Sequence, residues 1–225
     1  MQNTCNKKLI IFGINDFAEL VYNYIVKDIP DIDIAAFTVN SKYMPSSKKY
    51  NDIDVVPFED IEKIYQSNEY KILVCVGYKN MNINRKELFE GVKNKGYEIA
   101  DFIHSDAKVY SNNIGIGNII LPEVIIEPFV EIGCGNIFYT KCLISHHTKI
   151  GNFNFFAVDC CVAGHVSIEN NSFLGANSTI RNGINIGSYS LIGASAYVNK
   201  NVNEYNAVMP AKSIISSKKS TDFEI

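Results

Sequence analysis

Residues 144–168 read ISHHTKIGNFNFFAVDCCVAGHVSI, and every sixth residue of this stretch, starting from Ile144, is large and apolar. The spacing continues in both directions without a change of register, and its fifteen positions are Ile114, Ile120, Ile126, Ile132, Phe138, Ile144, Ile150, Phe156, Val162, Ile168, Leu174, Ile180, Ile186, Ile192 and Val198. An α-helix repeats every ~3.6 residues and a strand every ~2, so a period of six fits neither. It predicts a parallel β-helix in which three six-residue repeats form one triangular coil.

A smaller residue follows the large one by four positions in most repeats. These residues are small or β-branched and are predicted to point inward as well: Val124, Val130, Cys142, Thr148, Cys160, Val166, Ser172, Ser178, Ser190 and Ala196. Cys142 and Cys160 lie 18 residues apart in this pattern, so we interpret them as core residues rather than redox or metal-binding groups. The sequence contains no C-x-x-C pair, which argues against a zinc site.

The first hundred residues lack the six-residue period and alternate between strand-like and helix-like segments. We expect strands at 8–13, 32–39, 71–77 and 97–103, and helices at 17–26, from about 58, and at 84–95. This alternation predicts a small parallel sheet covered by helices, a Rossmann-like α/β domain. The expected organisation is an α/β domain at 1–104, a β-helix at 105–212 and a loose C-terminal tail at 213–225.

The composition of the 225 residues excludes several classes of protein. Apolar residues make up 47% and charged residues 20%, which excludes a disordered tail or a collagen. A net charge of −3 with only two arginines offers no basic face for nucleic acid. No apolar run reaches about 18 residues, so no contact with a membrane is expected. The polar start is not typical of a signal peptide, and we expect a cytoplasmic protein with reduced cysteines.

A ligand of an open parallel sheet binds beyond the carboxyl ends of its strands. The residues expected there are Gly13, Asn15, Asp16, Asn40, Gly77, Tyr78, Asn80 and Arg85. Gly13 opens a strand–helix turn whose amides can hold a phosphate, and the planar guanidinium of Arg85 suits a phosphate too. The fingerprint G-x-G-x-x-G is incomplete because Asn15 replaces its second glycine, which argues against NAD or FAD. The alternatives are a plain packing turn at Gly13 and a surface charge at Arg85.

Three of the four histidines, His146, His147 and His165, lie within the repeat. Residues that are 18 positions apart stack on each other in successive coils and form a column. His147 and His165 therefore share one column, and Gly164 follows His146 in the adjoining column. We expect an open pocket beside His146 at Gly164, where the Gly164 amide donates to a ligand. Histidine titrates near neutrality and is typical of general-base catalysis. The alternative is that these polar residues satisfy one another at a subunit contact.

The repeat, the segment Ser145-His-His-Thr-Lys-Ile-Gly151 and the preceding α/β domain resemble bacterial sugar acetyltransferases, over residues 8–212. These are the sialic-acid O-acetyltransferase type and the N-acetyltransferases of nucleotide-linked 4-amino sugars. The resemblance implies a left-handed β-helix and a homotrimer, with acetyl-CoA between neighbouring β-helices and a nucleotide-linked sugar on the α/β domain. It implies N-acetylation of a 4-amino-4,6-dideoxy sugar for surface glycans, without a metal; O-acetylation of a sialic acid or another sugar hydroxyl is the alternative.

The resemblance also implies roles for single residues. His146 matches the general base, next to His147, and Gly164 matches the donor to the oxyanion. Coenzyme binding is implied for Gly164, His165, Asn182, Gly193, Ala194, Pro210, Ala211 and Lys212.

Two departures from the family pattern stand out. His147 stands where the family has an acid that orients the base, which leaves Asp159 or a neighbouring subunit for that task. Val208-Met209 precedes Pro210-Ala211, where the family usually has glycine. Two other classes remain open: a γ-class carbonic anhydrase, whose three zinc-binding histidines are spaced differently, and an inactive scaffold.

Overall fold

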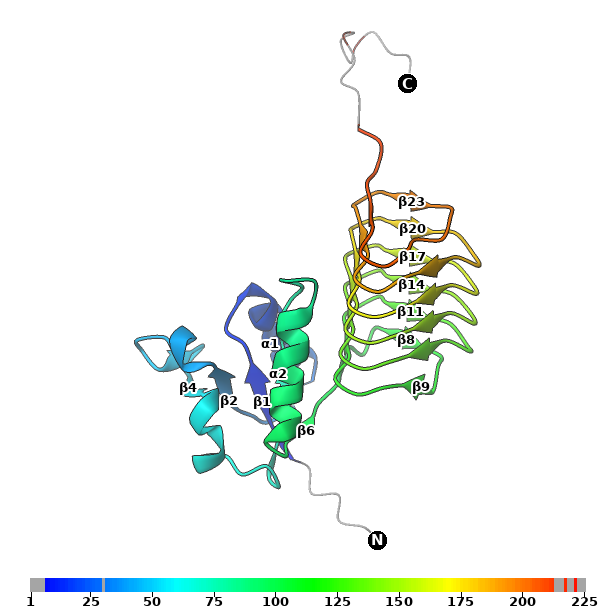
Figure 1. Cartoon of the computed structure of the whole chain (residues 1–225). Coiled ribbons are helices and arrows are strands. Elements are labelled where there is room, and N and C mark those ends of the chain that lie inside the picture. Colours follow the sequence, from blue (N-terminus) through cyan, green and yellow to red (C-terminus); the bar gives the residue numbers. More distant parts are fainter. Residues whose placement is uncertain (1–6, 30, 213–216, 218–220, 222–225) are drawn as a thin grey trace.

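The computed structural model describes residues 7–29, 31–212, 217 and 221. It consists of an α/β domain and a β-helix that stand side by side (Figure 1). The predicted loose tail at 213–225 lies, but for two residues, outside the described part of the chain. Within that part no helix has the length and apolar character needed to cross a membrane.

The α/β domain is built on a six-stranded sheet with the order β3-β4-β2-β1-β5-β6. Its strands are β1 (Lys8–Phe12), β2 (Ile34–Val39), β3 (Lys49–Tyr50), β4 (Ile53–Pro57), β5 (Tyr70–Val74) and β6 (Glu98–Ile99). All neighbours pair in parallel except β3 and β4, which form an antiparallel hairpin. The sheet is therefore mixed, because the segment between β2 and β4 makes a tight turn with positive φ at Asn51 and Asp52.

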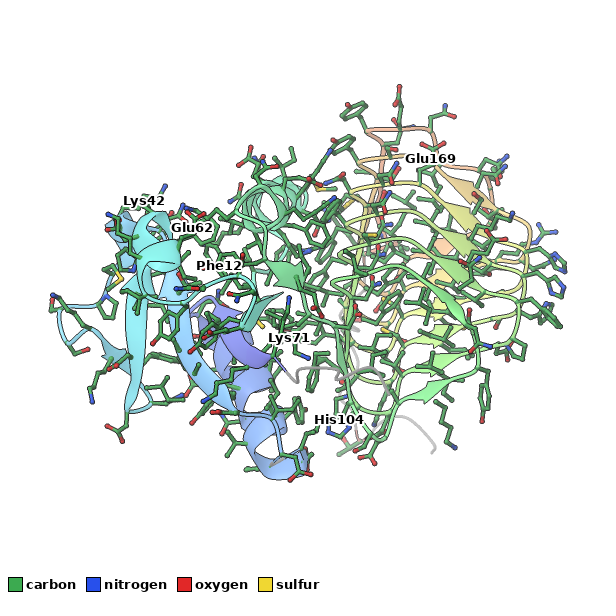
Figure 2. The ribbon with its side chains drawn as sticks, turned by 90° about the horizontal axis from the view of Figure 1, so that it is seen from below. Phe12, Lys42, Glu62, Lys71, His104 and Glu169 are labelled. Carbon is green, nitrogen blue, oxygen red and sulfur yellow. The ribbon has the colours of Figure 1, made fainter. Side chains whose placement is uncertain are left out.

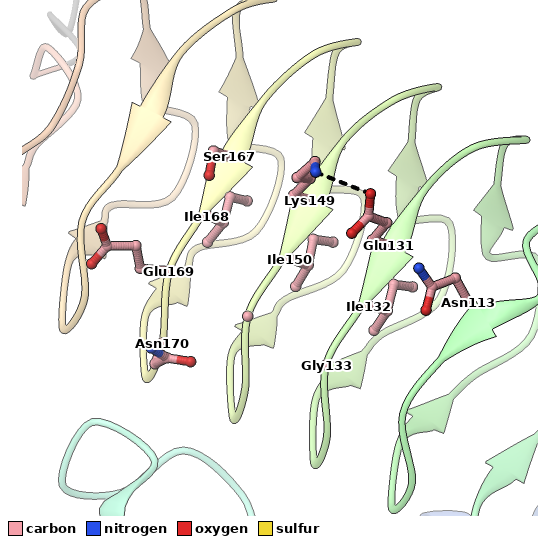
Figure 3. A pocket seen from close by; sticks show the side chains of 11 residues that line it. Asn113, Glu131, Ile132, Gly133, Lys149, Ile150, Ser167, Ile168, Glu169 and Asn170 are labelled. Carbon is pink, nitrogen blue, oxygen red and sulfur yellow. Dashed lines mark ion pairs between the residues drawn. The ribbon is translucent and has the colours of Figure 1, made fainter.

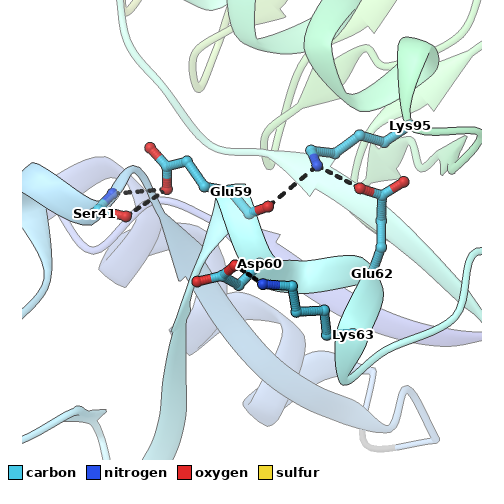
Figure 4. Close-up of polar contacts among 6 residues, drawn as sticks. All are labelled: Ser41, Glu59, Asp60, Glu62, Lys63 and Lys95. Carbon is cyan, nitrogen blue, oxygen red and sulfur yellow. Dashed lines mark hydrogen bonds and ion pairs between the residues drawn. The ribbon is translucent and has the colours of Figure 1, made fainter.

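Two α-helices and two 3₁₀ helices cover this sheet: α1 (Asp16–Asp28), α2 (Ile83–Asn94), η1 (Ser41–Tyr43) and η2 (Phe58–Lys63). The helix expected from about residue 58 is thus a short 3₁₀ element. Polar contacts hold η2 in place (Figure 4). Glu59 accepts hydrogen bonds from the backbone and hydroxyl of Ser41, and Lys95, just after α2, pairs with Glu62 at 2.5 Å.

The β-helix has three faces, and each coil contributes one two-residue strand to each face. The first face is β7 (Phe102–Ile103), β10 (Ile119–Ile120), β13 (Ile137–Phe138), β16 (Phe155–Phe156), β19 (Phe173–Leu174), β22 (Leu191–Ile192) and β24 (Ala207–Val208). The second face is β8 (Lys108–Val109), β11 (Ile125–Ile126), β14 (Leu143–Ile144), β17 (Cys161–Val162), β20 (Thr179–Ile180) and β23 (Tyr197–Val198). The third face is β9 (Asn113–Ile114), β12 (Glu131–Ile132), β15 (Lys149–Ile150), β18 (Ser167–Ile168) and β21 (Asn185–Ile186).

Strand β7 already pairs with β10 of the first face. The single strand expected at 97–103 is therefore split, with β6 in the α/β sheet and β7 in the β-helix. The β-helix begins at Phe102, a little before the predicted boundary at 104. We call its corners 1–2, 2–3 and 3–1 after the faces that they join; examples are 157–160, 145–148 and 133–136.

The hexapeptide prediction is confirmed by the core. Of the fifteen large positions only Ile114 is partly exposed, and the rest are buried. All ten smaller positions are buried too, Cys142 and Cys160 among them, and burial raises the pKa of the Cys142 thiol. Phe138 and Phe156 stack with ring centroids 4.6 Å apart, one coil above the other. Each buried large side chain stabilises the fold by ~1.5–3 kcal/mol, so the column as a whole is a major source of stability.

A column of polar side chains also points inward, at corner 3–1. It consists of Asn118, Asn136, Asn154, Ser172 and Ser190, all buried. The amide oxygen of Asn136 accepts from the Asn154 backbone at 2.8 Å, and its amide nitrogen donates to the Gly151 carbonyl at 3.0 Å. Asn154 repeats the pattern with Ser172 and Glu169 in the next coil. The column therefore satisfies corner backbone groups that no strand pairing reaches.

The α/β domain covers the outer surface of the first face. Ile119, Ile137 and Phe155 point outward from this face and form one buried cluster with residues of β1 and α1. At the junction seen from below in Figure 2, His104 Nε2 lies 3.0 Å from the Asp28 carboxylate at the end of α1. Since a triangular coil has one corner opposite each face, corner 2–3 is the corner turned away from the α/β domain.

The asparagine column yields a prediction about stability. Replacing Asn136 by alanine leaves the Asn154 N–H and the Gly151 carbonyl buried without their partners, so the free energy of unfolding in urea should fall by about 2–4 kcal/mol. Asn185→Ala is the matched control, because Asn185 is exposed on the third face, and it should change stability by less than ~0.5 kcal/mol. Equal losses for the two variants would contradict the role of the column.

Candidate active site

Three histidines gather at corner 2–3. His146 and His147 follow β14, and His165 follows β17 in the next coil. One ring nitrogen of each lies within 4.8 Å of the others, and all three side chains are exposed. The predicted shared column of His147 and His165 is confirmed, since their rings stack with centroids 4.9 Å apart and planes 14° apart. Phe129 continues the stack one coil below, 4.8 Å from His147.

The backbone is left-handed at each level of this stack. The φ angle is 65° at Phe129, 59° at His147, 58° at His165 and 70° at Gly183 in the coil above. Residues other than glycine are disfavoured in the left-handed region of φ, because their Cβ crowds the backbone. The histidine rings therefore stand on turns whose shape is dictated by the coil rather than by histidine's own preference.

The imidazole of His146 lies over the backbone of Gly164. A Cβ atom on Gly164 would stand 2.7 Å from His146 Cε1 and 3.0 Å from Nε2, so only glycine allows this ring position. The pocket that we expected beside His146 is therefore not open but filled by the ring itself. Within the described part of the chain the Gly164 amide donates no hydrogen bond. It is thus without a partner among these residues, although Gly164 itself is buried beneath the His146 ring.

The Nδ1 atoms of His146 and His147 are 3.1 Å apart. Two neutral rings at this distance need one Nδ1 to donate and the other to accept, because two lone pairs or two N–H groups repel. When His146 donates, its Nε2 carries the lone pair and can accept a proton. His147 thus contacts the atom of His146 that an orienting acid would contact.

An acidic residue does reach His146, at its backbone, and within this chain it is not Asp159. Asp159 lies at corner 1–2, at the other end of the second face, where its backbone bonds Thr140. The carboxylate of Glu127, one coil below, accepts a 2.8 Å hydrogen bond from the His146 backbone N–H. Glu127 stands 19 residues before His146, a spacing that places it one coil below at the same corner. The sequence did not single out Glu127, because a hydrogen bond to corner backbone leaves no pattern in the types of side chain.

The structure divides the predicted coenzyme residues into two groups. Gly164, His165 and Asn182 lie at corner 2–3, with the histidines. The residues Gly193, Ala194, Pro210, Ala211 and Lys212 lie at the C-terminal end of corner 1–2, where a Cβ on Gly193 would stand 2.9 Å from Pro210 Cδ. The second face, with Ile125, Leu143 and Cys161 pointing outward and only partly exposed, separates the two groups.

A shallow hollow of about 450 Å³ lies on the third face, between β12, β15 and β18 (Figure 3). Glu131 and Lys149 form an ion pair of 3.1 Å across it. None of the residues that line it belongs to the predicted site. The hollow therefore does not mark the histidine corner.

At the α/β domain the carboxyl ends of β2, β1 and β5 meet at one edge, as predicted. Gly13 there meets a packing requirement, since a Cβ on it would stand 2.7 Å from the Cys75 carbonyl oxygen. The Asn15 side chain accepts from the Phe17 and Ala18 amides at 3.0 Å each. These are the first-turn amides of α1, so the phosphate site expected at Gly13 is closed by the cap. Asp16, at the same helix start, adds a negative charge.

The other predicted residues of this edge differ in their exposure. The side-chain oxygen of Asn40, at the end of β2, is buried and has no hydrogen-bond partner among the described residues. An unpaired buried acceptor costs ~1–3 kcal/mol, which favours a ligand that donates to it. Tyr78 is 53% exposed and rests on Phe155 and Phe173 of the first face, with ring centroids 4.9 Å from each. Gly77 and the exposed Asn80 lie beside it.

Arg85 does not lie at the surface, so the predicted contact with a substrate phosphate is wrong. Its side chain is 1% exposed, and burial lowers the pKa of the guanidinium to about 9, so it stays charged at neutral pH. The guanidinium donates to Gly77 O on the α/β side and to Gly135 O, Phe153 O and Asn154 O of corner 3–1. Arg85 thus ties the α/β domain to two successive turns of the β-helix.

Comparisons with known proteins agree with this architecture. A profile of the family described as hexapeptide repeat of succinyl-transferase matches residues 165–200. A search of curated protein sequences gave no match. The acetyltransferase domain of PglB from Neisseria gonorrhoeae, solved with acetyl coenzyme A, superposes with a TM-score of 0.78 at 20% identity, over 93% of this chain and 100% of that one.

Two further solved structures are similar. PerB from Caulobacter crescentus, in complex with CoA and GDP-perosamine, has a TM-score of 0.77 at 20% identity and covers 88% of this chain and 91% of its own. WeeI from Acinetobacter baumannii has a TM-score of 0.79 at 16% identity and covers 89% and 95%. The chain has the fold of these acetyltransferase structures. The shared fold includes both the α/β domain and the left-handed β-helix, as the resemblance implied.

The role of Arg85 can be tested by comparing the chain's only two arginines. Arg85→Met removes the donor from several buried carbonyl groups at once, so the free energy of unfolding should fall by about 3 kcal/mol or more. Arg181→Met, at an exposed corner position, should stay within ~0.5 kcal/mol of the parent protein. A stable Arg85→Met protein that binds nucleotide-linked sugars more weakly would restore the phosphate-binding hypothesis.

Proposed function

We propose that this protein transfers the acetyl group of acetyl-CoA to the amino group of a nucleotide-linked sugar. The observation that carries the proposal is the arrangement at corner 2–3. The His146 ring lies on the Gly164 backbone, its Nδ1 faces His147, and its Nε2 is the remaining nitrogen for proton transfer. An inactive scaffold would not need a histidine ring in a position that is possible only because residue 164 is glycine. It would not need a backbone amide without a hydrogen-bond partner either.

In the proposed reaction His146 acts as the general base. As the sugar nitrogen forms a bond to the thioester carbon, Nε2 of His146 takes the proton that the nitrogen loses. The Gly164 N–H donates to the oxygen that becomes negative in the tetrahedral intermediate. The intermediate then breaks its carbon–sulfur bond, and the imidazolium returns the proton to the leaving thiolate, so that an amide and free CoA result.

The proposed acceptor follows from the α/β domain and from the similar structures. PerB was solved with GDP-perosamine, and a similar structure is described as GDP-perosamine N-acetyltransferase, with a TM-score of 0.71 at 16% identity. In this chain the unpaired oxygen of Asn40 and the exposed ring of Tyr78 offer an acceptor and an apolar surface to such a ligand. The closed cap at Asn15 argues that the diphosphate does not lie on the α1 terminus.

The proposed reaction needs a second copy of the chain. Asn40 and Tyr78 lie on the first-face side of the β-helix, whereas His146 lies at the opposite corner. A sugar held by the α/β domain therefore reaches the histidine corner of a neighbouring subunit and not that of its own chain. A homotrimer with acetyl-CoA between adjacent β-helices brings the two parts together and also unites the two groups of coenzyme residues that the second face separates.

The base can be tested by substitution. His146→Ala should lower the turnover of acetyl transfer by about two to four orders of magnitude, because proton transfer loses its acceptor. Asp159→Asn is the control, since Asp159 lies at corner 1–2, and it should keep the parent rate. Release of free thiol, measured with each nucleotide-linked amino sugar, gives the rate, and mass spectrometry identifies an amide product. An alkali-labile ester would instead support O-acetylation.

The need for a second copy is tested by complementation. A His146→Ala chain and an Asn40→Leu chain should each be nearly inactive alone. Mixed trimers from co-expression should regain activity at about one third of their sites, which is about one quarter of all sites at equal expression, where an intact corner meets an intact α/β domain from another chain. No recovery, in mixed oligomers verified by mass, would mean that one chain supplies both parts. Light scattering of the parent protein should report a trimer.

A further inference from the structure

The three histidines of corner 2–3 are more than the proposed reaction needs. General-base transfer uses His146 and one orienting group, and His147 already contacts its Nδ1. His165 bonds neither of them through a ring nitrogen, yet its ring stacks on His147 and stands edge-on to His146, with centroids 4.9 and 5.3 Å away. The cluster therefore brings together three nitrogen ligands on two adjacent coils.

The spacing of the nitrogens suits one metal ion. Three nitrogens at 2.0–2.1 Å from a tetrahedral zinc ion are about 3.4 Å apart. The His146 and His147 Nδ1 atoms are 3.1 Å apart, and one ring nitrogen of each of the three histidines lies within 4.8 Å of the others. Closing the remaining gap needs a shift of about 1.4 Å and a rotation of one of the stacked rings of His147 and His165, because imidazole binds a metal in its ring plane; rotamer changes of these exposed side chains supply both.

The surroundings permit a dication. The Glu127 carboxylate, bonded to the His146 backbone, lies one coil below, and the exposed Arg181 lies one coil above the level of His165. One acidic and one basic residue thus lie on the coils next to the cluster, and the imidazoles are the ligands. Imidazole selects Cu²⁺, Zn²⁺ and Ni²⁺ over Mg²⁺ and Ca²⁺, which prefer oxygen. Because all three rings are exposed, a fourth position stays open to water.

We propose that His146, His147 and His165 form a binding site for a divalent transition-metal ion of the zinc class, and that the bound ion blocks acetyl transfer. Coordination at Nδ1 uses the lone pair there, so the neutral His146 ring carries its proton on Nε2. That nitrogen then has nothing with which to accept the proton of the sugar amine. The metal site stands by itself, whereas the block rests on the proposed function.

Binding is measured directly, on the metal-free full-length protein. Calorimetric titration with Zn²⁺ should give one ion per chain, and Mg²⁺ should give no heat above dilution. Single substitutions His146→Asn, His147→Asn and His165→Asn should each weaken Zn²⁺ binding at least about tenfold, since each removes one ligand. Asp159→Asn is the control. Asp159 is an exposed residue with positive φ, like His147 and His165, but it lies at corner 1–2, so this variant should bind Zn²⁺ like the parent.

The outcomes separate the two parts of the proposal. Absence of a one-to-one site, or equal affinity in the parent and all three histidine variants, overturns the metal site. Zn²⁺ should also stop acetyl transfer at the concentration that half-saturates the calorimetric site, and EDTA should restore the rate. Binding that leaves the rate unchanged overturns the block. A metal-free protein without any acetyl transfer contradicts the proposed function, and the titration still decides the metal site.

Discussion

The stacking of 18-residue coils in strict register is the constraint on which the rest of this protein depends. Parallel pairing places each residue one strand spacing above its counterpart, as in the pair of Leu143 with Cys161. A side chain therefore always meets the same kind of neighbour, and columns form: isoleucine and phenylalanine inside, asparagine at corner 3–1, rings at corner 2–3. The histidine cluster is one such column with a neighbour from the adjoining column added.

The second organising contact is a buried charge. A guanidinium in the interior is costly unless its hydrogen bonds are made, and Arg85 makes them to backbone carbonyls of both domains. The positions of these carbonyl groups are set by the stacking of the coils. The hydrogen bonds of Arg85 therefore fix the α/β domain at one place along the β-helix. The carboxyl edge of the α/β sheet is thereby held beside the first face, with Tyr78 against Phe155 and Phe173.

These two constraints together explain why the chemistry is divided. The coil carries His146 and Gly164 at corner 2–3, while the domain junction places Asn40 on the opposite side of the same β-helix. The arrangement within one chain keeps the proposed base and the proposed sugar site apart. In the proposed reaction, association of copies is then part of the site and not an addition to it, and the apolar, partly exposed second face lies between the two groups of proposed coenzyme residues.

The fold of the β-helix and its histidine column were predictable from the sequence, because a period of six with inward side chains is a local pattern that every coil repeats. The α/β domain was predictable in its alternation, although β3, η2 and the split of residues 97–103 were not, since tertiary pairing decides such short elements. Only the tertiary structure revealed that Arg85 is buried, that Glu127 rather than Asp159 reaches His146, and that the His146 ring fills the space over Gly164. Those facts depend on where each side chain points and on what packs against it, and neither is encoded in spacing along the chain.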